Sequence, residues 1–315
     1  MTSHRYHRVD GFFVGKHFTA QSMQEVFAYK PRPNDIFIVT YPKCGTTWVQ
    51  HIVFYILNHG VPPKDPQEFE SKSPFFELMG QAAVDNLVRP GAIKTHLPFD
   101  RQPYSKDAKY IYVARNPFDC CVSFYHHMKL MPMYDFENGT FEEFFESFLR
   151  GEVDFGDYFD HLLSWYAHRN DPNVLFFTYE DLKKDVKGRI QKIADFLGEE
   201  YGKEVRNDPS LLERIMQFTS LEAMQKVVNP AMRQIGRKFV DVPFHLLPPW
   251  AQRLVEDCGD LLKKPMTGDF VRKGQVGGWR SNFTDDQVKR MKEWIAKRSA
   301  GTDVMDLWKD MQFAN

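Results

Sequence analysis

The sequence has few cysteines, no long apolar run and almost no net charge, and each shortage argues against a class of protein. Only four cysteines occur among 315 residues, and their spacing matches no metal site. No stretch approaches the roughly 20 apolar residues that a membrane-spanning helix needs. The net charge of −1 gives no overall support for binding a polyanion. We therefore expect a cytoplasmic protein with reduced thiols that binds no nucleic acid, no membrane and no metal.

The hydrophobic and aromatic contents, 43% and 15%, are enough to fill the core of one large α/β domain or two small ones. Runs of β-branched and aromatic residues predict strands at 36–41, 91–98, 110–114 and 174–179. Helical spacing of apolar residues predicts helices at 46–60, 140–150, 158–168, 186–197, 211–228 and 284–300. Residues 61–74 are predicted to form a loop, and residues 229–270 show no long apolar periodicity. Strands followed by helices indicate an α/β fold, with a central, mainly parallel sheet and helices on both faces.

The most informative stretch is residues 35–60, where a predicted strand leads through a short loop into a predicted helix. Pro42 ends the strand, Gly45 permits a tight turn, and Thr46 opens the helix. A helix N-terminus has unpaired N–H groups and partial positive charge, which suits an anion. In the usual triphosphate-binding loop, lysine follows the last glycine, whereas here Lys43 precedes Gly45. The stretch is either an anion site of a different order or an ordinary strand–turn–helix with a surface lysine.

Further polar residues follow the other predicted strands. Lys94 and His96 are two residues apart, so they share a face of an extended chain. Arg115 and Tyr179 stand at the carboxyl ends of the next two strands, where open α/β sheets bind ligands. The basic, glycine-rich stretch 271–284 could wrap an anion with side chains and backbone N–H groups. Each feature alone could also have no binding role, as surface residues or as a flexible loop.

Five segments in one order resemble the cytosolic sulfotransferases. They are TYPKCGTTW at 40–48, KTHLP at 94–98, RNPFDCCVSFYHH at 115–127, YEDL at 179–182 and RKGQVGGW at 272–279. The resemblance spans nearly the whole chain and implies a single domain, 1–315, with a fold like that of the P-loop kinases. It also implies the donor 3′-phosphoadenosine 5′-phosphosulfate (PAPS), with 3′-phosphoadenosine 5′-phosphate (PAP) as product. The acceptor would be the hydroxyl or amine of a small molecule, such as a phenol, a catecholamine-like compound or an alcohol.

The resemblance also implies roles for single residues. His96 would be the general base, a task that suits its pKa, while the charges of Lys43 and Lys94 would stabilise the transferred group. The implied nucleotide-binding residues are Lys43, Cys44, Gly45, Thr46, Thr47, Trp48, Arg115, Ser123, Tyr179, Thr219, Ser220, Leu221, Met224, Phe270, Val271, Arg272, Lys273 and Gly274. By position we also expect an aromatic acceptor pocket, lined by Phe13, Phe75, Leu78, Lys94, His96, Tyr125, His127 and parts of 229–250.

Three residues depart from the family pattern around the nucleotide. Cys44 replaces the usual serine, and because a helix N-terminus lowers a thiol pKa, we expect it to be sensitive to oxidation. Gly278 replaces the usual aspartate after the last loop glycine, which should loosen the basic loop. Leu221 stands where many members have phenylalanine, so stacking on the adenine would fall to Trp48.

The family's dimerisation pattern, K-x-x-x-T-V-x-x-x-E, is eroded here. Its positions hold Arg280, Thr284, Asp285 and Lys289, so an apolar contact is lost and one charge is reversed. We therefore expect a monomer or a weak dimer. A P-loop-type kinase and a non-catalytic nucleotide-binding protein remain alternative hypotheses.

Overall fold

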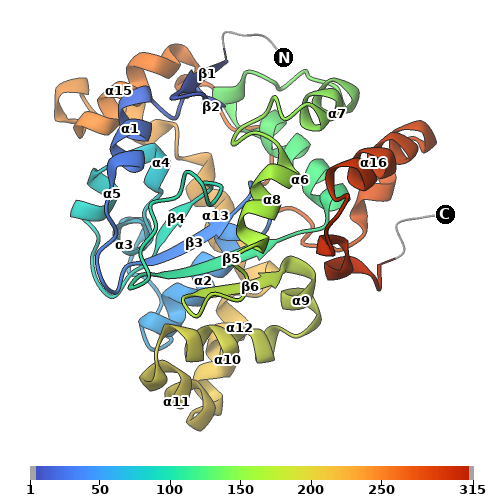
Figure 1. The fold of residues 1–315 in the computed structure, drawn as a ribbon. Helices are drawn as coiled ribbons and strands as arrows, with labels where there is room; N and C mark the ends of the chain where they lie inside the picture. The colour runs from blue at the N-terminus through green and yellow to red at the C-terminus, as the bar shows by residue number, and fades with distance from the viewer. Residues whose placement is uncertain (1–4, 312–315) are drawn as a thin grey trace.

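The computed structural model describes residues 5–311, and at its centre lies a four-stranded sheet (Figure 1). In spatial order the strands are β4 (Ile93–Thr95), β3 (Ile36–Thr40), β5 (Lys109–Ala114) and β6 (Val174–Thr178). All neighbouring pairs are parallel, with Val39 opposite Thr95 and Ala114 opposite Thr178. The predicted α/β fold and all four predicted strands are confirmed, and the loops after the strands emerge at one edge.

Helices cover both faces of this sheet, as predicted. Phe37 and Val39 of β3 pack in one core cluster, whereas Ile36 and Ile38 pack in a second cluster with α2 and α10. The helices are α1 (Ala20–Ala28), α2 (Thr46–Leu57), α3 (Pro66–Lys72), α4 (Phe76–Met79), α5 (Ala82–Asp85), α6 (Pro117–Leu130), α7 (Phe141–Leu149), α8 (Tyr158–Tyr166), α9 (Tyr179–Lys184), α10 (Val186–Leu197), α11 (Glu199–Asn207), α12 (Pro209–Phe218), α13 (Leu221–Arg233), α14 (Arg237–Val240), α15 (Pro249–Cys258) and α16 (Asp285–Arg298). Before the sheet, β1 (Tyr6–Val9) and β2 (Phe12–Gly15) form an antiparallel hairpin.

Among residues 5–311, no helix is both long and apolar enough to cross a bilayer.

Two of the predicted segments differ in the structure. The helix predicted at 211–228 is two helices, because the backbone of Ser220 is extended and its hydroxyl caps α13 by accepting from Ala223 N at 3.2 Å. The loop predicted at 61–74 contains α3, which Asp65 caps and Pro66 opens. Both misses arise from short capping signals that apolar periodicity does not register.

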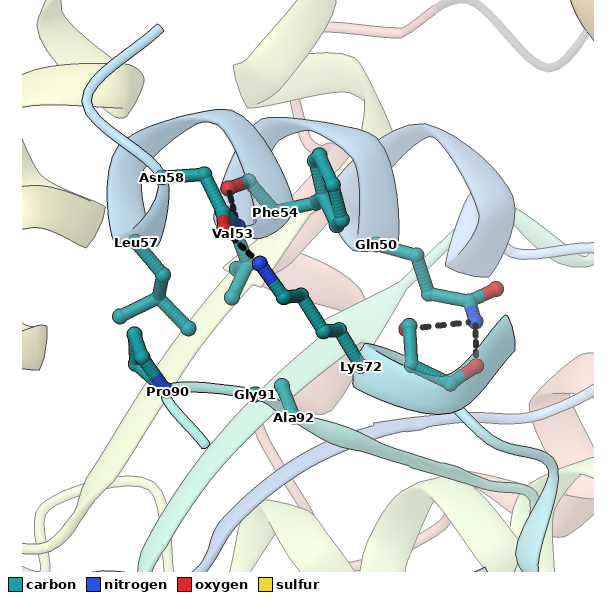
Figure 2. Close-up of a pocket in the computed structure, with 10 residues that line it drawn as sticks. Gln50, Val53, Phe54, Leu57, Asn58, Lys72, Pro90, Gly91 and Ala92 are labelled. Carbon is teal, nitrogen blue, oxygen red and sulfur yellow. Dashed lines mark hydrogen bonds between the residues drawn. The ribbon is translucent and has the colours of Figure 1, made fainter. Parts of the chain in front are cut away.

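The position of α2 is fixed by hydrogen bonds to the end of α3 (Figure 2). Gln50 Nε2, on α2, donates to Ser73 Oγ at 3.0 Å, and the Lys72 ammonium donates to Asn58 Oδ1. Asn58 Nδ2 in turn donates to the carbonyl of Phe54 at 2.7 Å. These contacts hold α2, and therefore its N-terminus, in place at the carboxyl edge of the sheet.

Candidate active site

A cavity of about 930 Å³ at the carboxyl edge of the sheet brings together most of the predicted site residues. Those that line it are Lys43, Gly45, Thr46, Thr47, Trp48, Phe75, Leu78, Lys94, His96, Arg115, Ser123, His127, Tyr179, Phe270, Val271, Arg272, Lys273 and Gly274. All the predicted residues lie in the described part of the chain. Seven of them do not line the cavity: Phe13, Cys44, Tyr125, Thr219, Ser220, Leu221 and Met224. Residues from all four strand ends therefore meet in one space.

The loop between β3 and α2 has a backbone that few residues tolerate. Gly45 has φ = 106°, and a Cβ there would lie 2.9 Å from a ring carbon of Tyr179, so only glycine fits. Lys43 has φ = 69°, which is uncommon for a residue with a side chain. No side chain of the described residues caps α2, so its N-terminal N–H groups are available to an anion.

One hydrogen bond decides which nitrogen of His96 can act as a base. His96 Nδ1 lies 2.8 Å from the carbonyl oxygen of Thr40. A carbonyl oxygen can only accept, so Nδ1 carries the proton and Nε2 keeps its lone pair. The backbone around the ring is also fixed: the His96 N–H donates to Glu77 Oε1 at 2.5 Å, and its carbonyl accepts from His161 Nε2 at 3.0 Å. The imidazole is thus held in one tautomer and one place.

The surroundings of His96 keep it uncharged. Its ring centroid lies 5.3 Å from that of Phe75 and 5.2 Å from that of Phe155. Burial, and secondly the charge of Lys94, lower the pKa of His96 well below its usual value. A neutral imidazole with a free Nε2 is the form that can take a proton at neutral pH.

Two lysines concentrate positive charge in the same space. Lys43 Nζ lies 4.1 Å from the ring centroid of Phe270, and Lys94 Nζ lies 3.7 Å from that of Phe75. Burial, together with the charges of Lys94 and two arginines, lowers the pKa of Lys43 to about 7. Burial also lowers the pKa of Lys94 to about 8. Cations crowded and desolvated in this way are suited to an anionic ligand that restores their charge.

Arg115 extends this positive region toward the basic loop. Its Nη1 donates to the carbonyl of Lys43 and its Nη2 to the carbonyl of Gln275, both at 3.1 Å. Its guanidinium lies 4.4 Å from the ring centroid of Tyr179. Within residues 5–311, neither Arg115 Nε nor Trp48 Nε1 has a hydrogen-bond partner, although both atoms are buried. Both residues line the cavity, and unpaired buried donors are costly, so the site fits a ligand rich in acceptor oxygens and nitrogens.

Asp119, which the sequence analysis missed, anchors the basic loop. Its carboxylate accepts from Gly277 N at 2.7 Å and from Trp279 N at 3.1 Å. These bonds fasten the backbone on both sides of Gly278, where we had expected looseness from the missing aspartate. The available signal was an acidic residue in the first turn of α6, but nothing in the sequence points to the loop as its partner.

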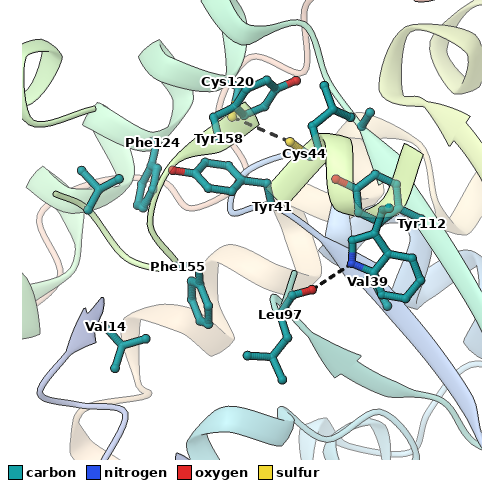
Figure 3. Close-up of a cluster of buried hydrophobic side chains, with 14 of the residues drawn as sticks. Val14, Val39, Tyr41, Cys44, Leu97, Tyr112, Cys120, Phe124, Phe155 and Tyr158 are labelled. Carbon is teal, nitrogen blue, oxygen red and sulfur yellow. Dashed lines mark hydrogen bonds between the residues drawn. The ribbon is translucent and has the colours of Figure 1, made fainter. Parts of the chain in front are cut away.

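Cys44 lies in the core and not in the cavity (Figure 3). Its side chain is fully buried, and its Sγ is 3.7 Å from Cys120 Sγ. The predicted lowering of its pKa by the helix N-terminus is wrong in direction, because burial raises the pKa of this thiol well above its usual range. The predicted sensitivity to oxidation therefore loses its physical basis.

Phe13 and Leu221 are also outside the lining and pack against other parts of the chain. The Phe13 ring stacks on Tyr6, with centroids 4.8 Å apart. Leu221 packs against the basic loop, since a Cβ on Gly274 would lie 2.9 Å from Leu221 Cδ1. The segment 219–224 therefore borders the loop 272–274, although it contributes nothing to the cavity wall.

Comparison with known proteins places this site in a family. The family model described as the sulfotransferase domain matches residues 33–235. Mouse sulfotransferase 1B1 is 35% identical over 306 residues, which cover 94% of this chain and 92% of the relative. Human sulfotransferase 1C2 is 30% identical over 296 residues, covering 91% and 90%.

Solved structures agree with the sequence relatives. The crystal structure of mouse sulfotransferase SULT7A1 complexed with PAP has a TM-score of 0.70 and 27% identity, and covers 97% of this chain and 98% of that one. Retinol dehydratase in a complex with retinol and PAP has a TM-score of 0.67 and 25% identity, covering 93% and 89%. The chain therefore belongs to the sulfotransferase family, and it is an enzyme that transfers a sulfuryl group from PAPS to a small acceptor.

Proposed function

We propose that His96 is the general base of this sulfuryl transfer and that Nε2 is the atom that takes the proton. The single observation behind this proposal is the 2.8 Å contact of Nδ1 with the Thr40 carbonyl, which leaves Nε2 unprotonated. As the acceptor oxygen loses its proton to Nε2, it forms a bond to sulfur. The bond between sulfur and the phosphate oxygen of the donor breaks, and that oxygen keeps the electron pair.

Lys43 and Lys94 stabilise the charge that moves during this step. Lys43 precedes the N-terminus of α2, so we assign it to the oxygen that leaves with the phosphate. Lys94 projects from β4 two residues before His96, and we assign it to the acceptor oxygen and the transferred group. PAPS supplies the activated sulfuryl group, and the chain supplies the base, the cations and the positioning.

We place the nucleotide with its 5′ end at residues 43–48 and its 3′-phosphate near Arg115 and Ser123. The 3′ end of the nucleotide also contacts Arg272, Lys273 and Gly274, on the loop that Asp119 anchors. The unpaired donors Arg115 Nε and Trp48 Nε1 support this placement, because a bound nucleotide offers acceptors to both.

The acceptor lies, in this proposal, against the apolar part of the cavity around His96. Phe75, Leu78 and Phe155 line that part, which favours a phenol, a catecholamine-like compound or an alcohol over a carbohydrate or a protein. We further propose that the chain acts as one domain, since one cavity draws residues from Lys43 to Gly274. We place it in the cytoplasm, where free thiols such as its four cysteines stay reduced. The four residues at the eroded dimerisation positions favour a monomer or a weak dimer.

The test combines turnover with nucleotide binding. Labelled PAPS is incubated with a panel of phenols, catecholamines and steroids, and the best acceptor is then used with His96→Ala. Loss of a general base typically costs about 10²–10⁴-fold in rate, while PAP affinity measured by calorimetry stays within about twofold. Turnover retained in His96→Ala would refute the assignment of the base. Lys43→Ala is expected to lose most of kcat and also to weaken PAP binding, because it removes a charge from the nucleotide end.

A further inference from the structure

The cavity wall carries a second set of polar side chains apart from Lys94 and His96. His17, His127 and Tyr134 all line the cavity, and we call them the second polar cluster. Phe155 connects the two regions, since its ring lies 5.2 Å from that of His96 and 5.0 Å from that of Phe18, the residue after His17. A bound acceptor that reaches His96 therefore lies within the same enclosure as the second polar cluster.

Asp154 fixes this cluster from behind. Tyr134 donates its hydroxyl proton to Asp154 Oδ2 at 2.5 Å, and the Gly15 N–H donates to Oδ1. His17 Nε2 lies 3.6 Å from the same carboxylate, and its ring meets that of Tyr134 edge to face at 5.0 Å. Asp154 is fully buried and does not line the cavity, so it positions Tyr134 and His17 but cannot itself contact a ligand.

His127 has an unmet hydrogen-bonding group in this cluster. Its Nδ1 is buried, yet within the described part of the chain it has no hydrogen-bond partner. The ring packs edge to face with Tyr134 at 5.7 Å and with Phe270 at 5.6 Å. A buried polar atom of this kind destabilises the structure unless it is paired. The Tyr134 hydroxyl proton is used in the hydrogen bond to Asp154, so toward the cavity the Tyr134 oxygen can only accept.

We propose that the acceptor carries a second, uncharged hydroxyl group, which hydrogen-bonds to His127 and Tyr134 while the reacting hydroxyl faces His96. This inference rests on the proposed function. A hydroxyl group can donate to the Tyr134 oxygen and can pair with His127 Nδ1 in either tautomer. The preferred substrates are therefore mainly apolar molecules with two hydroxyl groups, only one of which is sulfated in a given binding mode.

Charged groups fit this cluster less well, so among the proposed acceptors this inference favours a phenol or an alcohol over a catecholamine-like compound with its ammonium group. A carboxylate on the acceptor would be repelled by the nearby buried carboxylate of Asp154. An ammonium could not pair with Asp154, which does not reach the cavity, and it would share the enclosure with Lys43 and Lys94. Burial and those same two lysines lower the pKa of His127 well below its usual value, which shows how poorly a further cation is accommodated there.

The test uses acceptors that differ only in the second group. The parent acceptor is para-phenylphenol, and its kcat/KM is compared with the values for derivatives that carry a hydroxyl at the meta or the para position of the second ring. Two charged analogues carry a carboxylate or an aminomethyl group at that para position. We expect at least one dihydroxy compound to exceed the parent by about tenfold or more, because sites built to hydrogen-bond a hydroxyl group discriminate strongly against its absence. Both charged analogues should fall below the parent.

Variants then locate the effect. In His127→Phe the advantage in kcat/KM that the best dihydroxy compound has over the parent should disappear, whereas His168→Phe, outside the cavity lining, should keep it. Melting temperature and PAP affinity report whether His127→Phe is folded, and Tyr134→Phe serves as a second variant with the same expected direction. Turnover of the parent with no gain from a second hydroxyl group, or a gain that survives both variants, would overturn the inference alone. Failure to sulfate any member would overturn the proposed acceptor class and this inference with it.

Discussion

At the scale of single residues, the chemistry of the site depends on what each side chain loses by burial. His96 remains neutral because it is desolvated among aromatic rings. Its tautomer is determined by the hydrogen bond of Nδ1 to the Thr40 carbonyl. The lysines lose part of their preference for charge for the same reason, and they regain it when an anion binds. None of these effects follows from the residue type alone, since an exposed His or Lys would titrate at its ordinary pKa.

The pH dependence of the free enzyme follows from these residues. The pKa of Lys43 is about 7 and that of Lys94 about 8, so both lose their charge as pH rises through this range. His96 loses its basic form only when pH falls through a pKa well below 6.5. We therefore expect kcat/KM for the donor to fall as pH rises from 7 to 8 and not to fall as pH drops through 6.5.

Substitution of Lys43 separates its contribution to the pH dependence from that of Lys94. In Lys43→Arg the residual activity should decline at a higher pH, because a guanidinium stays charged. A profile in kcat/KM that rises between pH 7 and 8, or that loses activity with a midpoint at the ordinary histidine pKa, contradicts this account.

The cysteines give a second prediction at this scale. All four are buried in the structure, and burial raises the pKa of Cys44 and Cys121. Ellman's reagent should therefore react slowly with the native protein and should titrate four thiols per chain only in denaturant. A thiol that reacts as fast as free cysteine in the native state, and that disappears in Cys44→Ala, would restore the idea of an oxidation-sensitive loop.

At the scale of elements, Asp119 at the start of α6 determines the position of the basic loop. Asp119→Ala removes the acceptor of two backbone hydrogen bonds, at Gly277 and Trp279. Because that loop also holds Arg272–Gly274, we expect the Kd for PAP to rise by about tenfold, equivalent to about 1.4 kcal/mol.

The control for this prediction is Asp286→Ala, which removes an exposed first-turn carboxylate from α16. It should leave the Kd for PAP unchanged when both variants are measured by calorimetry. Equal affinities for PAP in the wild type and in Asp119→Ala would mean that the loop is held by other contacts.

Element boundaries were the least predictable part of the fold. The strands were predicted because their β-branched and aromatic runs are local patterns, and α2 and α10 because their apolar spacing is regular. The break between α12 and α13 escaped prediction, since a single hydroxyl, that of Ser220, competes there with the helix. The helices α14 and α15, between residues 229 and 270, were not predicted, because their segment shows no long apolar period.

At the scale of the whole molecule, the sequence predicts which strand ends gather at one edge, but not which residues face them. Lys43, His96 and Arg115 follow strands, and all three line one cavity. Glu77 and Asp119 were not found, because they meet the site only after distant segments fold together. The family comparisons support the predicted sulfotransferase over the P-loop-type kinase and the non-catalytic nucleotide-binding protein.

The oligomeric state is a prediction at this scale. Thr284 caps α16, and Asp285 beside it is exposed at the position where the family pattern has an apolar residue. We expect light scattering to give the mass of one chain, 37.0 kDa, at micromolar concentration. A stable particle of twice that mass, dissociated by substitution of Arg280 or Asp285, would contradict the prediction.

The central claim is that one nucleotide spans the cavity from Lys43 to the loop at Arg272–Gly274, with His96 Nε2 facing the reacting end. The most direct measurement is a crystal structure of the full chain with PAP at saturating concentration. We predict the 5′-phosphate at Lys43 and the N-terminus of α2, and the 3′-phosphate in contact with Arg115 and the basic loop. An empty cavity, a reversed nucleotide, or His96 with its Nε2 turned away from the 5′-phosphate would contradict the account.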